Sequence, residues 1–195
     1  MCKWLLPLLT ALFLAGCGEP SWQTKDVTGV MPALEFNLTD ENGRAVSARD
    51  YLGKPTLLFF GFTHCPDVCP TTLAYLAAAT QQLGGGMSAE VQILFVSVDP
   101  ARDDPPTLRR YTDAFGPQII GLTGDKAALD ALTRRYFSLY EYGAKDAAGN
   151  YDVMHSTAVF AFNRKGRNAL CSARATRWMR SLRICADSRK TVRNH

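Results

Sequence analysis

The feature that most constrains the fold is a mainly apolar run, residues 56–60, that leads through Gly61 into two cysteines four residues apart. Cys65 and Cys69 are each followed by a proline, and a helical pattern of apolar residues begins directly afterwards. A short apolar run bounded by Gly and Pro is typical of a strand buried on both faces. Proline is tolerated in the first turn of a helix, so Pro70 indicates a helix start. The sequence therefore predicts that both thiols lie on a turn between a buried strand and a helix.

The predicted position of the thiols has chemical consequences. The first turn of a helix presents free backbone N–H groups and the positive end of the helix dipole. That environment is expected to lower the pKa of a thiol and to favour the thiolate, which binds metals and attacks disulfides. The turn is therefore the first candidate for a functional site.

Strands and helices alternate along the rest of the chain. Residues 34–46 form a predicted hairpin with a tight turn at Asn42-Gly43. Alternation of the two element types predicts an α/β fold with a central, mostly parallel sheet flanked by helices. Reactive groups collect at the carboxyl ends of strands in such sheets, which is where the cysteine turn lies. Further strands are expected at 91–98, 119–122 and 157–162, and helices at 71–83, 107–115 and 125–137.

The spacing of the two cysteines does not by itself choose between a disulfide and a metal site. Two thiolates are soft donors suited to Cu(I), and one imidazole would complete a three-coordinate site. The histidines are His64, His155 and His195. Strand geometry tends to point His64 away from its neighbour Cys65. His155 follows a long polar loop, 141–154, and directly precedes a predicted strand, so a distant ligand could reach the cysteines from there.

Four further residues have candidate roles near this site. Asp99 is interpreted first as a turn residue, although the end of the second buried strand places it near the cysteine turn. Asp152 is either a second partner that orients His155 or an exposed loop acid. Asp103 reads first as a turn residue, and Met154 is expected to pack in the core.

The N-terminal segment, residues 1–17, is predicted to be a lipoprotein-type signal peptide. Lys3 precedes an apolar run at 5–15 that is too short to span a membrane. The sequence Leu-Ala-Gly-Cys that ends at Cys17 resembles a bacterial lipobox, which implies cleavage before Cys17 and lipid on its sulfur. A plain secretory signal is the alternative. Residues 18–33 then form a linker, and the domain is expected on the periplasmic side of a bacterial membrane, where thiols can oxidise.

The net charge of +4 is concentrated at the C-terminus, because residues 168–195 are rich in Arg and Lys and contain one acid, Asp187. The remainder of the chain has more acids than bases, so bulk charge does not indicate nucleic-acid binding. The tail is either a basic helix that lies on anionic lipid or, as we favour, the product of a reading-frame shift near Arg167. Under the second hypothesis Cys171 and Cys185 have no role and the sheet lacks its proper edge.

Three motifs in order resemble the Sco (SenC) family: FTHCPDVCPTTL, VSVDPARDDPPTL and YDVMHSTAVFAFNRKGR. The resemblance extends over about residues 36–167. It implies a thioredoxin-like domain, residues 34–167, with an added N-terminal hairpin and a membrane tether. It also implies that Cys65, Cys69 and His155 are copper ligands and that the protein takes part in copper delivery to cytochrome c oxidase.

Two functions follow as expectations. The first is a metallochaperone that binds Cu(I) or Cu(II). Its expected partners are the copper-bearing subunit of cytochrome c oxidase or another copper-site protein, a periplasmic copper donor and a thiol reductant. The second is a thiol–disulfide oxidoreductase that uses Cys65 and Cys69 as a redox pair to reduce a partner's copper-ligand cysteines, with His155 dispensable. Thioredoxins have a cis-proline facing the cysteines, and the absence of proline between Asn150 and Ala158 favours metal binding.

Overall fold

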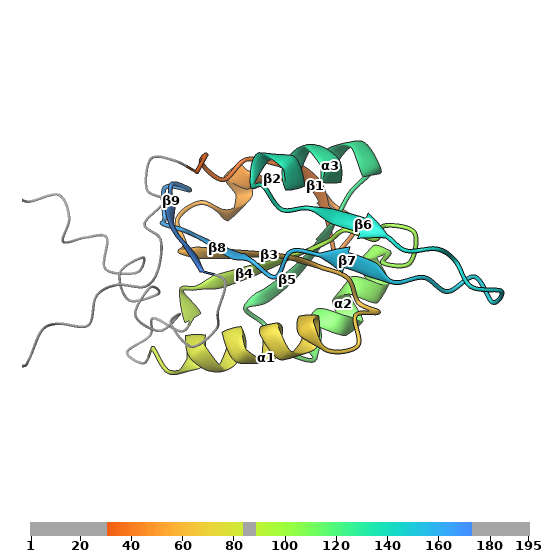
Figure 1. Cartoon of the computed structure of the whole chain (residues 1–195). Coiled ribbons are helices and arrows are strands. Elements are labelled where there is room, and N and C mark those ends of the chain that lie inside the picture. The colour runs from red at the N-terminus through yellow and green to blue at the C-terminus, as the bar shows by residue number, and fades with distance from the viewer. Residues whose placement is uncertain (1–30, 84–88, 173–195) are drawn as a thin grey trace, which may run out of the picture.

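A seven-stranded sheet forms the centre of the protein in the computed structural model, which describes residues 31–83 and 89–172 (Figure 1). The strand order is β2-β1-β5-β4-β3-β8-β9. The three central strands are parallel to one another, and antiparallel strands are added at both sides. The strands are β1 (Asn37–Asp40), β2 (Ala45–Ser47), β3 (Thr56–Gly61), β4 (Gln92–Ser97), β5 (Ile119–Thr123), β8 (Val159–Phe162) and β9 (Asn168–Ser172).

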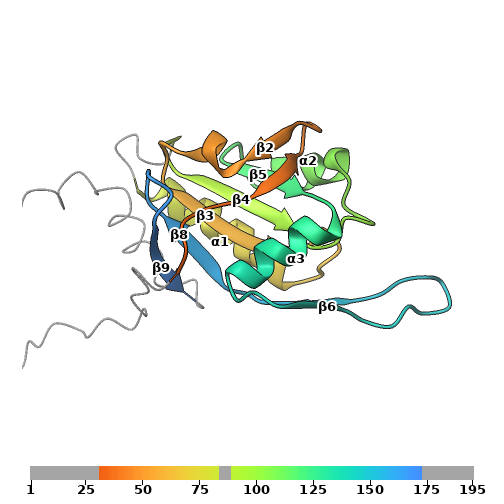
Figure 2. The ribbon, with the colours of Figure 1, turned by 90° about the horizontal axis from the view of Figure 1, so that it is seen from above.

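Helices cover both faces of this sheet. Helices α1 (Val68–Gln81) and α2 (Pro105–Asp113) lie on one face, and α3 (Lys126–Arg135) lies on the other (Figures 1 and 2). A short 3-10 helix, η2 (Ala48–Tyr51), follows β2. The predicted thioredoxin-like α/β architecture, with an N-terminal hairpin formed by β1 and β2, is confirmed.

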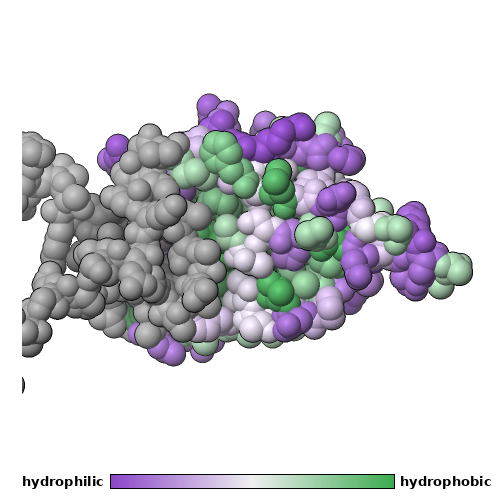
Figure 3. All heavy atoms as spheres, in the orientation of Figure 1, coloured by the Kyte–Doolittle hydropathy of each residue, from purple (hydrophilic) through white to green (hydrophobic). Residues whose placement is uncertain are grey.

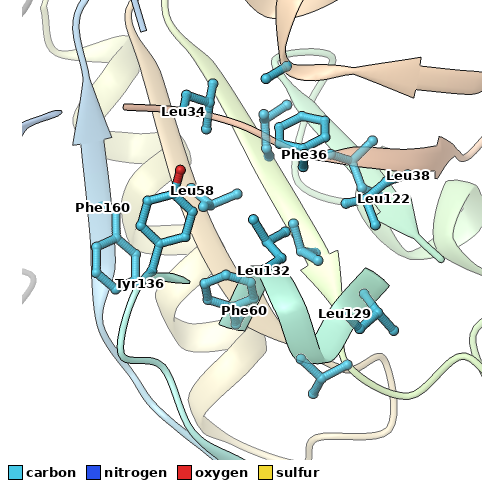
Figure 4. Packing of buried hydrophobic residues seen from close by; sticks show 14 of the residues in the cluster. Leu34, Phe36, Leu38, Leu58, Phe60, Leu122, Leu129, Leu132, Tyr136 and Phe160 are labelled. Atoms are coloured by element: carbon cyan, nitrogen blue, oxygen red, sulfur yellow. The ribbon is translucent and has the colours of Figure 1, made fainter. Parts of the chain in front are cut away.

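Strand β3 is enclosed on both faces, since every one of its residues is buried, as is every residue of β4. Alternate side chains enter two separate cores. Leu57 and Phe59 pack in the cluster beneath α1 and α2. Leu58 and Phe60 pack in the cluster beneath α3, which Figure 4 shows from close by. Each fully buried Leu or Phe contributes on the order of 1.5–3 kcal/mol of transfer free energy, so both cores hold β3 firmly.

A second, two-stranded sheet projects from the main body as a long hairpin (Figure 2). It consists of β6 (Tyr140–Tyr142) and β7 (Val153–His155), and Tyr140 is paired with His155. We call the segment from β6 to β7 the arm. The sequence predicts an unstructured polar loop at 141–154, so the pairing at the base of the arm corrects that expectation.

The sheet continues past residue 167, where the sequence predicts the domain to end. Strand β9 is antiparallel to β8, and Phe160 is opposite Cys171. An edge strand therefore does form here, beside β8, in the stretch where the reading-frame hypothesis expects the proper edge of the sheet to be lost. Residues 173–195, with Cys185 and His195, lie outside the described part of the chain, as do residues 1–30, with Cys17. The reading-frame hypothesis for the tail remains a prediction.

The surface of the described chain carries a few large apolar side chains among polar ones (Figure 3). Phe137, Leu139 and Met154 are 78%, 77% and 71% exposed. None of the helices in the described ranges is long and apolar enough to cross a membrane. Met154 was expected to pack in the core, and its exposure overturns that expectation, because alternation along β7 turns it away from the side that carries His155.

Candidate metal centre

The two cysteines are held where β3 passes into α1. Cys65 lies in the turn, and its backbone N–H donates to the carbonyl of Phe62 at 3.3 Å. Helix α1 begins at Val68, three residues earlier than predicted, so Cys69 is its second residue. The backbone N–H of Cys69 donates to Cys65 Sγ at 3.4 Å. The helix start therefore directs one of its free N–H groups at the first sulfur.

His155 reaches the cysteines from the arm. It is the last residue of β7, and its Nε2 lies 3.3 Å from Cys69 Sγ. The other ring nitrogen, Nδ1, lies 3.0 Å from the carbonyl oxygen of Ser156. A carbonyl only accepts hydrogen bonds, so this contact favours the tautomer with the proton on Nδ1 and a lone pair on Nε2. The rings of Phe59 and Phe62 pack edge-on against the imidazole.

The ligand atoms of Cys65, Cys69 and His155 all lie within 4.8 Å of one another. They come from two segments that are 86 positions apart in the chain. Two sulfurs and one unprotonated imidazole nitrogen form a soft donor set, which suits Cu(I). The structure thus brings together the three predicted ligands, and their chemistry fits copper.

Burial controls the charge of these groups. Cys69 is fully buried, and this burial raises the pKa of its thiol. The expectation that the helix terminus lowers the pKa is wrong for this cysteine, because desolvation of the thiolate outweighs the dipole. Burial also lowers the pKa of His155, which keeps the imidazole neutral near pH 7. The metal-free centre therefore contains a protonated Cys69 and a neutral His155.

The two acids predicted to support the site have different surroundings. Asp99 is fully buried, and its carboxylate accepts hydrogen bonds from Arg102 at 2.5 Å and from the Tyr151 hydroxyl at 2.7 Å. It is thus connected to the arm rather than to the ligands themselves. Asp152 is exposed, and its backbone carbonyl accepts from Gly143. The partner of His155 Nδ1 is the backbone carbonyl of Ser156 and not the side chain of Asp152.

Sequence reasoning missed Asp103, which it treated as a turn residue. This carboxylate is fully buried and accepts hydrogen bonds from the backbone N–H of Thr63 at 2.9 Å and from the Thr63 hydroxyl at 2.6 Å. It also accepts from the Ser97 hydroxyl at 2.5 Å. The available signal was that Asp103 lies in the loop after a buried parallel strand, six residues past Ser97, because neighbouring parallel strands end at the same edge. His64, next to Thr63, is exposed, with Nδ1 3.7 Å from Asp103 Oδ1.

Comparison with known proteins identifies a family. A family model described as SCO1/SenC matches residues 29–183, which continues past the predicted domain end at 167. Protein SCO2 homolog, mitochondrial, of Homo sapiens is 36% identical over 174 residues, which cover 82% of this chain and 65% of that protein. Protein SCO1 homolog, mitochondrial, of Homo sapiens is 35% identical over 132 residues, which cover 67% of this chain and 44% of that protein. The chain thus spans between 44% and 65% of the length of these two relatives.

Solved structures show the same fold. The structure of Bradyrhizobium japonicum ScoI with copper bound is 34% identical with a TM-score of 0.70, and the match covers 80% of this chain and 98% of that one. The structure of Arabidopsis thaliana ScoI with copper bound is 29% identical with a TM-score of 0.72, and the match covers 81% of this chain and 98% of that one.

The comparisons correct the predicted location. The curated relatives from mouse, human and yeast are named as mitochondrial proteins, so the prediction of a lipid-anchored location on the periplasmic side of a bacterial membrane is wrong. Lipidation of Cys17 stays a prediction from the sequence, since this residue lies outside the described ranges.

Proposed function

Because the chain belongs to the SCO1/SenC family, we propose that it is a copper metallochaperone that assists assembly of the copper centre of cytochrome c oxidase. Copper is its cargo, held by Cys65 Sγ, Cys69 Sγ and His155 Nε2. The observation that carries this proposal is the convergence of these three atoms within 4.8 Å. Two related structures of this fold, from a plant and a bacterium, are described as having copper bound.

The three ligands have separate tasks in this proposal. Neutral His155 offers the Nε2 lone pair without first losing a proton. Cys69 gives up its proton when copper binds, because only the thiolate is a strong ligand. Cys65 is partly exposed whereas Cys69 is buried, so an incoming thiol meets the cargo on the side of Cys65. Transfer then proceeds by ligand exchange, in which a partner's sulfur replaces the ligands of this chain one at a time.

The proposed recipient is the copper-bearing subunit of cytochrome c oxidase or another protein with a copper site. A copper donor and a thiol reductant act before this step, since copper binding needs both cysteines reduced. Oxidation of Cys65 and Cys69 to a disulfide would remove two of the three ligands and stop loading.

The direct test is Cu(I) binding by the reduced protein, measured by competition with a chromophoric chelator. Wild type should bind one copper. Cys65→Ser, Cys69→Ser and His155→Ala should each weaken binding by more than the roughly 10–100-fold that loss of an outer partner costs. His64→Ala is the matched control, because His64 is exposed and has no place in the ligand set. Binding that ignores His155 would refute the three-ligand site.

A thiol–disulfide oxidoreductase is the second candidate, favoured by the difference in exposure between the two cysteines. A partly exposed Cys65 with a buried Cys69 behind it is an arrangement in which the first thiol attacks and the second resolves. This activity would reduce a partner's copper-ligand cysteines and would not need the imidazole. A His155→Ala variant that keeps full activity in oxidase assembly while losing copper would support the reductase over the metallochaperone.

A further inference from the structure

The loop that joins β4 to α2 contacts both segments that carry the proposed copper ligands. We call residues 99–103 of this loop the bracket. At one end of the bracket, Asp103 holds the cysteine turn: it accepts hydrogen bonds from the backbone N–H and the hydroxyl of Thr63, at 2.9 Å and 2.6 Å. Thr63 lies two residues before Cys65. Both atoms of Thr63 are therefore fixed by one buried carboxylate.

At its other end the bracket holds the arm through Tyr151. Arg102 Nη1 donates to the carbonyl oxygen of Tyr151 at 2.9 Å, and its guanidinium carbon lies 3.7 Å from the centre of the Tyr151 ring. The Tyr151 hydroxyl donates to Asp99 Oδ1 at 2.7 Å, and Arg102 Nε pairs with Asp99 Oδ2 at 2.5 Å. Asp99, Arg102 and Tyr151 thus each contact the other two.

The contacts of Arg102 also lead to the imidazole. Its guanidinium carbon lies 5.6 Å from the centre of the Phe62 ring, and that ring packs edge-on against His155 at 5.7 Å between centroids. Next to the bracket, the Tyr142 hydroxyl donates to the carbonyl of Val98 at 2.5 Å. Strand β6 and the residue two positions before β7 are therefore tied to the same loop, and Tyr142 pairs with Val153, two residues before His155.

This anchoring matters because a two-stranded hairpin is at best marginally stable alone in water. The arm has only one ladder of three paired residues on each strand. Without the bracket, the arm would keep this ladder and the hydrogen bond from the Tyr140 hydroxyl to Asp130 at 2.5 Å. His155 would then be less well ordered, and copper binding would have to supply more of the free energy that orders it. With the bracket, that ordering is done when the chain folds.

We propose that the bracket positions His155 against Cys69, so that Asp99, Arg102 and Tyr151 set copper affinity without touching the copper. These are positioning residues, and the proposal rests on the copper site proposed above. It assigns a role to the ion pair of the buried Asp99 with the partly buried Arg102, which the ligand set alone does not explain.

A metal-free experiment tests the anchoring itself. Tyr151→Ala removes the hydroxyl and the stacked ring, and Arg102→Lys keeps the charge beside Asp99 but loses the planar fork. Hydrogen exchange of the backbone amides in β6 and β7 should become at least about tenfold faster in both variants, while protection of α1 is unchanged. Arg109→Lys, on the exposed face of α2, is the matched control and should exchange like wild type. Unchanged protection of the arm in both variants would overturn the proposal.

Copper affinity tests the route through His155. Arg102→Lys should weaken Cu(I) binding roughly tenfold or more when His155 is present. In the His155→Ala background the same substitution should have no effect, because the positioned group is gone. An equal loss in both backgrounds would contradict the proposal and indicate a general destabilisation instead. If His155→Ala binds copper as wild type does, the proposed copper site fails, and hydrogen exchange still decides whether the bracket orders the arm.

Discussion

At the scale of single residues, Gly61 gives the buried sulfur of Cys69 its space. A Cβ atom built on Gly61 would lie 2.6 Å from Cys69 Sγ and 2.7 Å from Cε2 of Phe95. Gly61 is the last residue of β3 and both of these neighbours are fully buried, so little can shift to relieve the overlap.

We therefore expect Gly61→Ala to lower the free energy of unfolding by about 1–3 kcal/mol, the usual cost of overpacking a core. It should also weaken Cu(I) binding, because Cys69 Sγ is displaced. Urea unfolding and chelator competition measure the two effects. Gly149→Ala is the comparison: nothing lies within 4 Å of its Cβ, and its φ of +84° limits the cost to the backbone. An intact copper affinity in Gly61→Ala would argue against this close packing around the sulfur.

The raised pKa of Cys69 predicts a pH dependence of copper binding. The thiol keeps its proton at neutral pH, because burial raises its pKa, and copper must displace that proton. Affinity for Cu(I) should therefore increase with pH, by about tenfold per unit for each proton released. The lowered pKa of His155 means that the imidazole adds no proton release above about pH 6.5.

Chelator competition between about pH 6.5 and 8 measures this slope. Cys69→Ser should reduce it by about one proton, whereas His155→Ala should weaken binding and leave the slope as it is. The same slope in wild type and Cys69→Ser would show that Cys69 does not carry the displaced proton.

The three proposed ligands were predictable from the sequence, and their surroundings were not. Cys65 and Cys69 stand on a recognisable strand-to-helix pattern, and His155 lies in a motif of its own. The sequence does not show that Asp103 binds Thr63 across 40 positions, or that a backbone carbonyl orients His155. The pKa of Cys69 was predicted in the wrong direction, because a helix start can be read locally whereas burial depends on the whole fold.

At the scale of elements, β9 forms the edge of the sheet beside β8, the strand that follows His155 in the chain. It is antiparallel to β8, which in turn is antiparallel to β3. Its loss would leave the backbone groups on the outer edge of β8 unpaired and available to another chain, while the edge that faces β3 stays paired.

We expect a chain that ends at residue 167 to be less stable than one that ends at residue 172. At about 1 kcal/mol for each net hydrogen bond, losing the β9 ladder should cost roughly 3 kcal/mol or more. The shorter chain should also associate through its exposed β8 edge. Urea unfolding and light scattering of the two truncated proteins give the comparison, and since both lack residues 173–195, only β9 differs. Identical unfolding midpoints would show that β9 contributes nothing to stability.

The elements also differ in how well the sequence predicts them. Strands β3 and β4 are continuous apolar runs, and the structure places them within a residue or two of the expected positions. The arm was expected to be a loop because its strands are three residues long and enclose a polar tip. The arm contacts the loop after β4 through Tyr142 and Tyr151 and helix α3 through the Tyr140 hydroxyl, and no local sequence pattern records these contacts.

At the scale of the whole molecule, the site is assembled from three parts of the chain: the cysteine turn, the bracket and the arm. The α/β architecture could be predicted because alternating elements admit few arrangements of a parallel sheet. The way the bracket joins the other two parts could not, because it depends on side chains that meet only after the sheet has formed.

The distance of 86 positions between Cys69 and His155 sets an order of events. Before the sheet closes, Cys65 and Cys69 are neighbours along the chain, but nothing holds His155 beside them. The complete trio of ligands appears once β3, α1 and the arm are all in place. Binding of copper by all three proposed ligands thus indicates that the chain has folded. A chain that is unfinished or unfolded lacks the complete site and has no copper held there to transfer.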